Sequence, residues 1–191
     1  MDLRQFFFKF RSYTPIPLLL VMLYFSQPYI PAIYWGLVLI IIGESFRIWA
    51  VRNAGGRTRT RKVGAPSLVT SGPFAYVRNP LYLGNVIIYL GFVLVAGGNY
   101  MWWIFVACLV FFIVQYSLIV SLEQETLLNK FGNEYSVYCE NVPALIPRLT
   151  PWKVNSDATP KPKKIFKPEK STLLNIVLIL LLIFLRSKIS L

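Results

Sequence analysis

Two sites at the borders of long apolar segments carry residues that could bind a charged small molecule. The first is Arg78-Asn79-Pro80, which ends a turn-rich stretch just before an apolar run. Proline suits the first position of a helix because its missing N–H would be unpaired there anyway. The N–H groups of a first helical turn, with an arginine beside them, favour a carboxylate or a phosphate. The second is Glu123, at the end of another apolar run, whose carboxylate can accept hydrogen bonds from a ligand.

Several kinds of catalysis are excluded by the residue types. The 191 residues include no histidine, which removes Ser-His-Asp and Cys-His mechanisms and histidine-rich metal sites. Cys108 lies in an apolar run and Cys139 in a polar segment, so we expect two free thiols, no disulfide and no metal site. Chemistry must therefore use carboxylates, tyrosines, arginine, backbone groups or a cofactor.

Long apolar runs place these residues at a membrane. Hydrophobic residues make up 55% of the chain and charged residues 15%, less charge than a soluble domain of this size normally carries. The runs predict two helical hairpins, residues 15–25 with 32–51 and residues 81–96 with 100–122. A shorter run, residues 173–185, predicts a marginal fifth span or an interfacial helix. We therefore expect an all-α, polytopic membrane bundle of four to five transmembrane helices.

The distribution of basic residues predicts the orientation of the bundle. Lysine and arginine fall in four groups, at residues 4–11, 47–78, 130–170 and 186–188. The two short loops, residues 26–31 and 97–100, contain none. This pattern places the N-terminus, residues 53–77 and residues 123–170 on the cytosolic side, and with them a cofactor pocket. The net charge of +12 therefore indicates topology and contact with anionic lipid, and not nucleic-acid binding.

Changes of composition divide the chain into four parts. Residues 1–52 form an N-terminal transmembrane hairpin. Residues 53–150 form a core of cytosolic loop, transmembrane hairpin and an amphipathic helix that continues from Glu123. Residues 151–170 form a basic, proline-rich linker, and residues 171–191 a hydrophobic helix. Within the first part, Glu44 and Arg47 are three residues apart, a spacing that favours a structural ion pair.

Two motif blocks carry a family resemblance. The first, residues 67–82, reads Ser-Leu-Val-Thr-Ser-Gly-Pro-Phe-Ala-Tyr-Val-Arg-Asn-Pro-Leu-Tyr. It resembles the Leu-Val-(Thr)-x-Gly-x-Tyr-x-x-x-Arg-His-Pro-x-Tyr block of the isoprenylcysteine carboxyl methyltransferase-like family, which includes phospholipid methyltransferases. The family's second block is similar to Glu123-Gln124-Glu125, Phe131-Gly132-Asn133-Glu134-Tyr135, Tyr138 and Pro147. The resemblance covers residues 57–147, with a helical hairpin between the blocks.

The resemblance implies an integral-membrane methyltransferase that uses S-adenosylmethionine, lacks a Rossmann fold and acts on a lipid or prenylated acceptor. Loop backbone and the start of the third membrane helix would hold the methionine carboxylate, and aromatic side chains would flank the adenine. Carried over residue by residue, with Arg78 added for its charge, the cofactor site would comprise Ser67, Leu68, Val69, Phe74, Arg78, Asn79, Pro80, Leu81, Tyr82 and Glu123. No catalytic residue follows, because an activated sulfonium needs chiefly positioning and exclusion of water.

Three positions depart from the family's pattern. Asn79 stands where the family has histidine, and Phe74 where tyrosine is usual. Ile119 stands where the carboxyl methyltransferases have a substrate-contacting arginine, one helical turn before Glu123. Because an aliphatic side chain cannot hold a carboxylate, we expect Ile119 to contact an acceptor that presents no free carboxylate.

Other functions remain open from the sequence. A phospholipid N-methyltransferase belongs to the same family. The chain also has a loose resemblance to membrane reductases of the steroid-reductase kind, which share a Phe-Gly…Tyr…Tyr pattern and use NADPH. In such an enzyme the basic residues 57–62 could bind the phosphate of NADPH. A non-catalytic membrane adaptor would bind neither cofactor, so the binding of S-adenosylhomocysteine or NADPH distinguishes the three.

Overall fold

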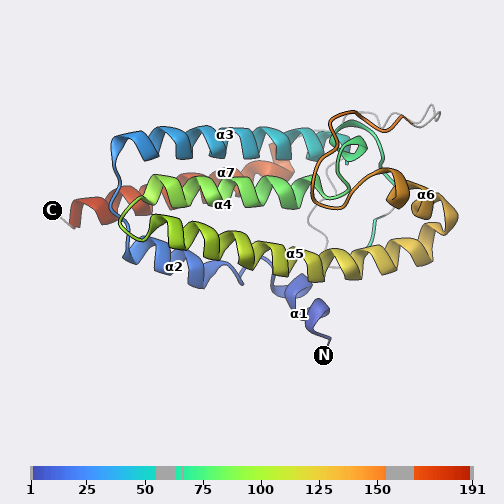
Figure 1. Cartoon of the computed structure of the whole chain (residues 1–191), viewed down its shortest axis with the longest axis horizontal. Coiled ribbons are helices and arrows are strands. Elements are labelled where there is room, and N and C mark those ends of the chain that lie inside the picture. Colours follow the sequence, from blue (N-terminus) through green and yellow to red (C-terminus); the bar gives the residue numbers. More distant parts are fainter. Residues whose placement is uncertain (1, 55–62, 66, 154–165, 190–191) are drawn as a thin grey trace.

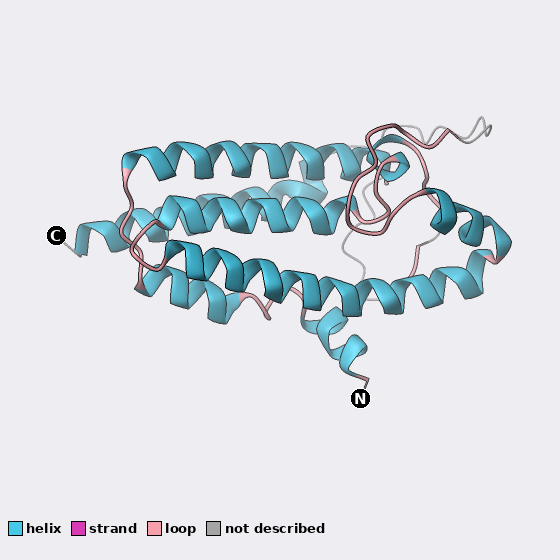
Figure 2. Cartoon of the chain, viewed as in Figure 1, coloured by secondary structure: helices cyan, strands magenta, loops and turns pink. Residues whose placement is uncertain are grey.

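A computed structural model describes residues 2–54, 63–65, 67–153 and 166–189. All regular elements in these ranges are helices (Figure 2), which confirms the predicted all-α class. They are α1 (Leu3–Phe10), α2 (Ile16–Tyr24), α3 (Ile30–Asn53), the 3₁₀ turn η1 (Gly72–Ala75), α4 (Pro80–Ala96), α5 (Met101–Phe131), α6 (Asn133–Asn141) and α7 (Phe166–Ile189).

Helices α3, α4, α5 and α7 form an elongated bundle (Figure 1). Among the described residues, three helical segments are long and apolar enough to cross a membrane: α3, α5 and the Glu169–Ile189 part of α7. Helix α4 is shorter, with 17 residues, or about 25 Å. Helix α2 has nine residues, too few to cross a hydrocarbon core of about 30 Å. The first predicted hairpin therefore has one short arm, and the protein is a membrane protein.

The closest pair in the bundle is α3 with α4, and glycines make the approach possible. Gly36 faces Gly91, and Gly43 faces Gly84. A Cβ atom at Gly36 would lie 2.6 Å from the Gly91 carbonyl oxygen, and one at Gly43 would lie 2.9 Å from the Gly84 oxygen. In a bilayer the hydrophobic effect drives helix association only weakly, because the lipid tails are as apolar as the helices. Small residues instead allow the two backbones to approach closely and pack.

The two short loops of the bundle meet at one end. Gln27 N–H donates to the Ala96 carbonyl at 2.8 Å, and Ser26 Oγ donates to the same oxygen at 3.1 Å. Helix α3 starts just after this contact, and α4 ends at it. The C-terminal end of α3 and the first turn of α4 therefore lie together at the opposite end of the bundle. That end also carries the first motif block.

Two features differ from or refine the predicted elements. Helix α5 runs unbroken past Glu123 to Phe131, and the chain turns at Gly132, whose φ of +54° suits glycine. Helix α7 begins at Phe166, inside the segment predicted as linker. The physical reason is Glu169, which is buried and bonded to another helix, a contact that the local composition does not reveal.

Candidate functional site

The loop before α4 is hydrogen-bonded to the chain that follows α6. Three backbone hydrogen bonds of 2.9 Å join the segments: Arg78 N–H to Pro143 O, Arg148 N–H to Tyr76 O, and Trp152 N–H to Ala75 O. The two motif blocks, separated in sequence by a transmembrane hairpin, therefore form one continuous structure.

Side chains strengthen this contact. Tyr138 Oη donates to the Phe74 carbonyl at 2.7 Å, and Asn79 Nδ2 donates to the Ala144 carbonyl at 3.0 Å. Burial raises the pKa of the Tyr138 hydroxyl, so it remains a proton donor at physiological pH. The Asn79 side chain is thus used to hold the chain after α6, and it does not cap α4.

An apolar cluster lies beneath the first block. Tyr135, Tyr138 and Val142 are buried, and Leu68 packs against them. Ser67 is exposed, whereas Val69 and Phe74 are half-buried. Of the residues predicted for the cofactor, Leu68 therefore belongs to the packed base of the loop, and Ser67 lies at its surface.

Two buried polar atoms of the loop lack partners among the described residues, namely Arg78 Nε and Ser71 Oγ. Leaving a buried donor unpaired costs about 1–3 kcal/mol. A guanidinium also matches the geometry of a carboxylate or phosphate. These atoms fit a ligand that carries an anionic group.

The first turn of α4 offers fewer free donors than the sequence predicted. Tyr82 N–H and Leu83 N–H both donate to the Asn79 carbonyl at 3.2 Å, and Pro80 is buried. Pro80 has no N–H of its own. The positive charge offered to an anion at this point is therefore mainly that of Arg78.

Tyr82 and Glu123 are in direct contact. Tyr82 Oη donates to Glu123 Oε1 at 2.9 Å, which joins the first turn of α4 to α5. The Tyr82 ring stacks on Tyr116, with 4.5 Å between centroids and 20° between planes. Two residues chosen from separate motif blocks thus meet, and stacking on a third ring fixes one of them.

Tyr135 of α6 is buried in the cluster beneath the loop. Burial raises the pKa of its hydroxyl, and the neighbouring Cys139 raises it further. The hydroxyl therefore remains a proton donor at physiological pH.

Ile119 lies one turn before Glu123 but has no exposed surface. It belongs to a packed apolar cluster that also contains Phe8, Phe112 and Leu122. Phe8 of α1 belongs to the same cluster, so Ile119 is enclosed by packed side chains and is not open to an acceptor in this structure.

Several polar residues near the site were not singled out from the sequence. Asn85 Nδ2 donates to Tyr116 Oη at 3.1 Å, and Thr14 Oγ1 donates to Gln115 Oε1 at 2.6 Å. Asn85, Gln115 and Tyr116 interrupt apolar runs. Polar residues within membrane segments are costly and often functional, a signal that could have identified them.

The sequence also raised a possible nucleotide-phosphate site and argued against a metal site. The basic residues 57–62, considered for a nucleotide phosphate, lie outside the described residues. Within the described ranges, no group of three or more histidine, cysteine, aspartate or glutamate residues could hold a metal ion. Cys108 and Cys139 are free thiols.

Comparisons with known proteins agree with the motif resemblance. A family model described as phospholipid methyltransferase matches residues 31–134, which run from α3 into α6 and include Tyr82 and Glu123. The protein-S-isoprenylcysteine O-methyltransferase of Schizosaccharomyces pombe is 36% identical over 85 residues, which are 43% of this chain. The alignment spans 34% of the relative's own length. No solved structure matches.

Both matches are to methyltransferases, which confirms the resemblance seen in the motifs. Neither supports the membrane-reductase alternative.

Proposed function

The chain belongs to the phospholipid methyltransferase family, and from this premise we propose that it transfers a methyl group from S-adenosylmethionine to a lipophilic acceptor. The observation that carries the proposal is the junction of the two motif blocks. It brings together the unpaired Arg78 Nε and the Tyr82–Glu123 hydrogen bond at one end of the bundle.

Arg78 is the residue best suited to hold the methyl donor. S-adenosylmethionine would supply an electrophilic methyl group on a sulfonium, and it also carries a carboxylate. The guanidinium of Arg78 can bind that carboxylate, and its buried Nε would then gain the partner it lacks. Residues 67–69 and Phe74 line the same loop, where backbone groups and an aromatic face could flank the adenine.

Glu123 would bind polar groups of the donor. A carboxylate has about four acceptor positions, so Glu123 can accept hydrogen bonds from hydroxyl or amino groups while Tyr82 holds one of its oxygens. Pro80, Leu81 and Asn79 shape the start of α4 beside this pair. These residues position the donor and exclude water, which is the main demand of methyl transfer.

The acceptor would enter from the bilayer, and the donor from the cytosol. The two comparisons name two acceptor classes, phospholipid and prenylated cysteine. Ile119 favours an acceptor without a free carboxylate, because no positive charge stands at that position. Phospholipid N-methylation is therefore the second candidate, and in either case the side chains packed around Ile119 must move to expose it.

Ligand binding by the purified protein in detergent tests this proposal. Calorimetric titration should show binding of S-adenosylhomocysteine and none of NADPH. Binding of NADPH alone would favour the reductase alternative, and binding of neither would favour a non-catalytic adaptor.

Orientation is tested separately by thiol labelling. Asn99 lies in a short loop at one end, and Glu140 on α6 at the other; both are exposed. With Cys139 replaced by serine, Asn99→Cys and Glu140→Cys should react with a membrane-impermeant maleimide from opposite sides. Labelling of both from one side would contradict a cytosolic donor site.

A further inference from the structure

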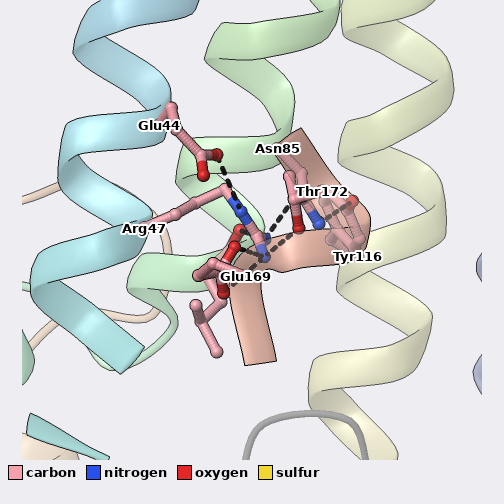
Figure 3. Close-up of polar contacts among 7 residues, drawn as sticks. Glu44, Arg47, Asn85, Tyr116, Glu169 and Thr172 are labelled. Atoms are coloured by element: carbon pink, nitrogen blue, oxygen red, sulfur yellow. Dashed lines mark hydrogen bonds and ion pairs between the residues drawn. The ribbon is translucent and has the colours of Figure 1, made fainter. Parts of the chain in front are cut away.

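A cluster of buried charged side chains joins α3, α4 and α7 (Figure 3). Arg47 is 6% exposed and Glu169 is 2% exposed. Arg47 Nη2 lies 3.2 and 3.1 Å from the two carboxylate oxygens of Glu169, and Arg47 Nε lies 3.6 Å from Glu44 Oε2. Burial of such charges is costly, and an apolar packing of equal volume is often as stable. Their presence therefore requires a reason beyond attachment of α7.

The contacts of Arg47 continue toward the candidate site. Arg47 Nη1 donates to Asn85 Oδ1, and Asn85 Nδ2 donates to Tyr116 Oη at 3.1 Å. Tyr116 stacks on Tyr82, whose hydroxyl holds Glu123. Side-chain contacts thus run without interruption from α7 to the proposed donor-binding pair.

Arg47 also fixes which way the Asn85 amide faces. A guanidinium has only donors, so it must meet the amide oxygen, and the amide nitrogen is then directed at Tyr116. The orientation of Asn85, and with it the hydrogen bond received by Tyr116, depends on where Arg47 is held.

Helix α4 leaves room for this arrangement. A Cβ atom at Gly84 would lie 2.5 Å from Arg47 Cγ, so only glycine allows the arginine stem to cross here. Arg47 Nη1 also lies 3.4 Å from the Leu81 carbonyl, in the first turn of α4. The arginine therefore contacts the same turn that carries Tyr82.

We propose that α7, which lies outside the residues matched by the family model, helps to position the residues of the candidate site. Glu169 holds Arg47, Arg47 orients Asn85, and Asn85 and Tyr116 set the position of Tyr82 beside Glu123. Glu169, Arg47 and Asn85 are thus positioning residues. The inference rests on the proposed function, in which Tyr82 and Glu123 bind the methyl donor.

The test separates docking of α7 from positioning of the site. In the double variant Arg47→Met with Glu169→Leu, made in a Glu44→Gln background so that no buried carboxylate loses Arg47, uncharged side chains replace the ion pairs, so α7 can still pack while the contact with Asn85 is lost. We expect an unfolding temperature close to that of the wild type, together with an S-adenosylhomocysteine dissociation constant raised about tenfold, the scale of effects carried through packed contacts.

Tyr116→Phe provides a second variant that leaves the ion pair intact. It removes the hydroxyl bonded to Asn85 and keeps the ring, so it should weaken S-adenosylhomocysteine binding by a similar factor without loosening α7. Glu169→Asp, which keeps the charge, should recover part of the affinity lost in Glu169→Gln. Lys170→Gln, an exposed charge at the next position, is the matched control and should change nothing.

The outcomes are distinct. Unchanged affinity for S-adenosylhomocysteine in a folded double variant and in Tyr116→Phe would overturn the inference. The charged cluster would then serve only to attach α7 to the bundle. If the double variant does not fold, the comparison of Glu169→Gln, Glu169→Asp and Lys170→Gln decides, and equal affinity in the three would overturn the inference. Failure of the wild type to bind S-adenosylhomocysteine would instead overturn the proposed function.

Discussion

One side of α4 lies against α3 and another against α5, and the two contacts are built differently. Toward α3, Gly84 and Gly91 bring the backbones together, with a would-be Cβ at Gly91 only 2.7 Å from the Gly36 carbonyl. Toward α5, Tyr82 and Asn85 project hydroxyl and amide groups that bond Glu123 and Tyr116.

The difference separates two tasks within a single helix. A backbone contact through glycine has no rotamers to change, so it fixes the position of α4 rigidly. Polar side chains on the other side can exchange partners with a ligand at modest cost, because their hydrogen bonds are individually worth about 1 kcal/mol. We infer that the glycine contact with α3 holds α4 in place, that Arg47 of α3 orients Asn85, and that ligands act on the α5 side.

The largest effect should come from breaking the glycine contact. Gly91→Leu places a branched side chain where even a Cβ atom meets the α3 backbone, and α4 must separate from α3. We expect a loss of about 3 kcal/mol or more in the free energy of unfolding, at the upper end for overpacking. Denaturant unfolding in detergent measures it.

The matched control is Ala107→Leu, which adds similar volume at an exposed position of α5. It should unfold like the wild type. Equal stability of Gly91→Leu and Ala107→Leu would show that the α3 contact is not rigid.

The second effect should appear in ligand binding and not in folding. Glu123→Ala removes the acceptor of the Tyr82 hydrogen bond and the proposed partner of donor polar groups. We expect S-adenosylhomocysteine affinity to fall by about 1–3 kcal/mol, the usual scale for a charge-assisted hydrogen bond. Glu125→Ala, an exposed carboxylate two residues along, is the control and should bind normally. Unchanged affinity in folded Glu123→Ala would remove Glu123 from the site.

A third effect concerns acceptor choice on the α5 side. Because Ile119 offers no positive charge, the wild type should methylate a neutral or amine-bearing lipid about tenfold faster than a farnesylcysteine analogue, a factor that corresponds to about 1.4 kcal/mol. Competing the two acceptors in one radiolabelled assay measures the ratio. Preference for the farnesylcysteine analogue would refute the argument from Ile119 and leave the methyltransferase assignment intact.

Local composition predicted the ends of the helices that carry the candidate site. Runs of apolar residues and the Arg78-Asn79-Pro80 border predicted where α4 begins, and the second block predicted Glu123 near the end of an apolar run. Both follow from local composition. The structure then places Tyr82 Oη 2.9 Å from Glu123 Oε1. The motif blocks assigned both residues to one cofactor site, but they did not predict this hydrogen bond.

Contacts that depend on helix rotation or on distant segments could not be predicted. Whether Asn85 meets Tyr116 depends on how α4 and α5 are turned about their axes, which spacing within one helix does not give. Glu169 lies 122 residues from Arg47, and its neighbours are lysines and prolines typical of a linker. Its burial is set by the packing of α7, so a local pattern predicted only the Glu44–Arg47 pair.

The smallest effect should come from a second tyrosine on the same side of α4. Tyr89 lies two turns after Tyr82, and its ring packs on Phe112 with 4.8 Å between centroids. Removing its hydroxyl keeps this apolar contact, whereas Tyr82→Phe loses the hydrogen bond to Glu123. We expect Tyr89→Phe to change unfolding by less than about 0.5 kcal/mol and to bind S-adenosylhomocysteine normally. Tyr82→Phe should weaken binding by about 1 kcal/mol. Titrating both variants with S-adenosylhomocysteine measures how far the ligand-binding part of α4 extends from its first turn. Equal losses of affinity in the two variants would show that this part reaches Tyr89, in the middle of the helix.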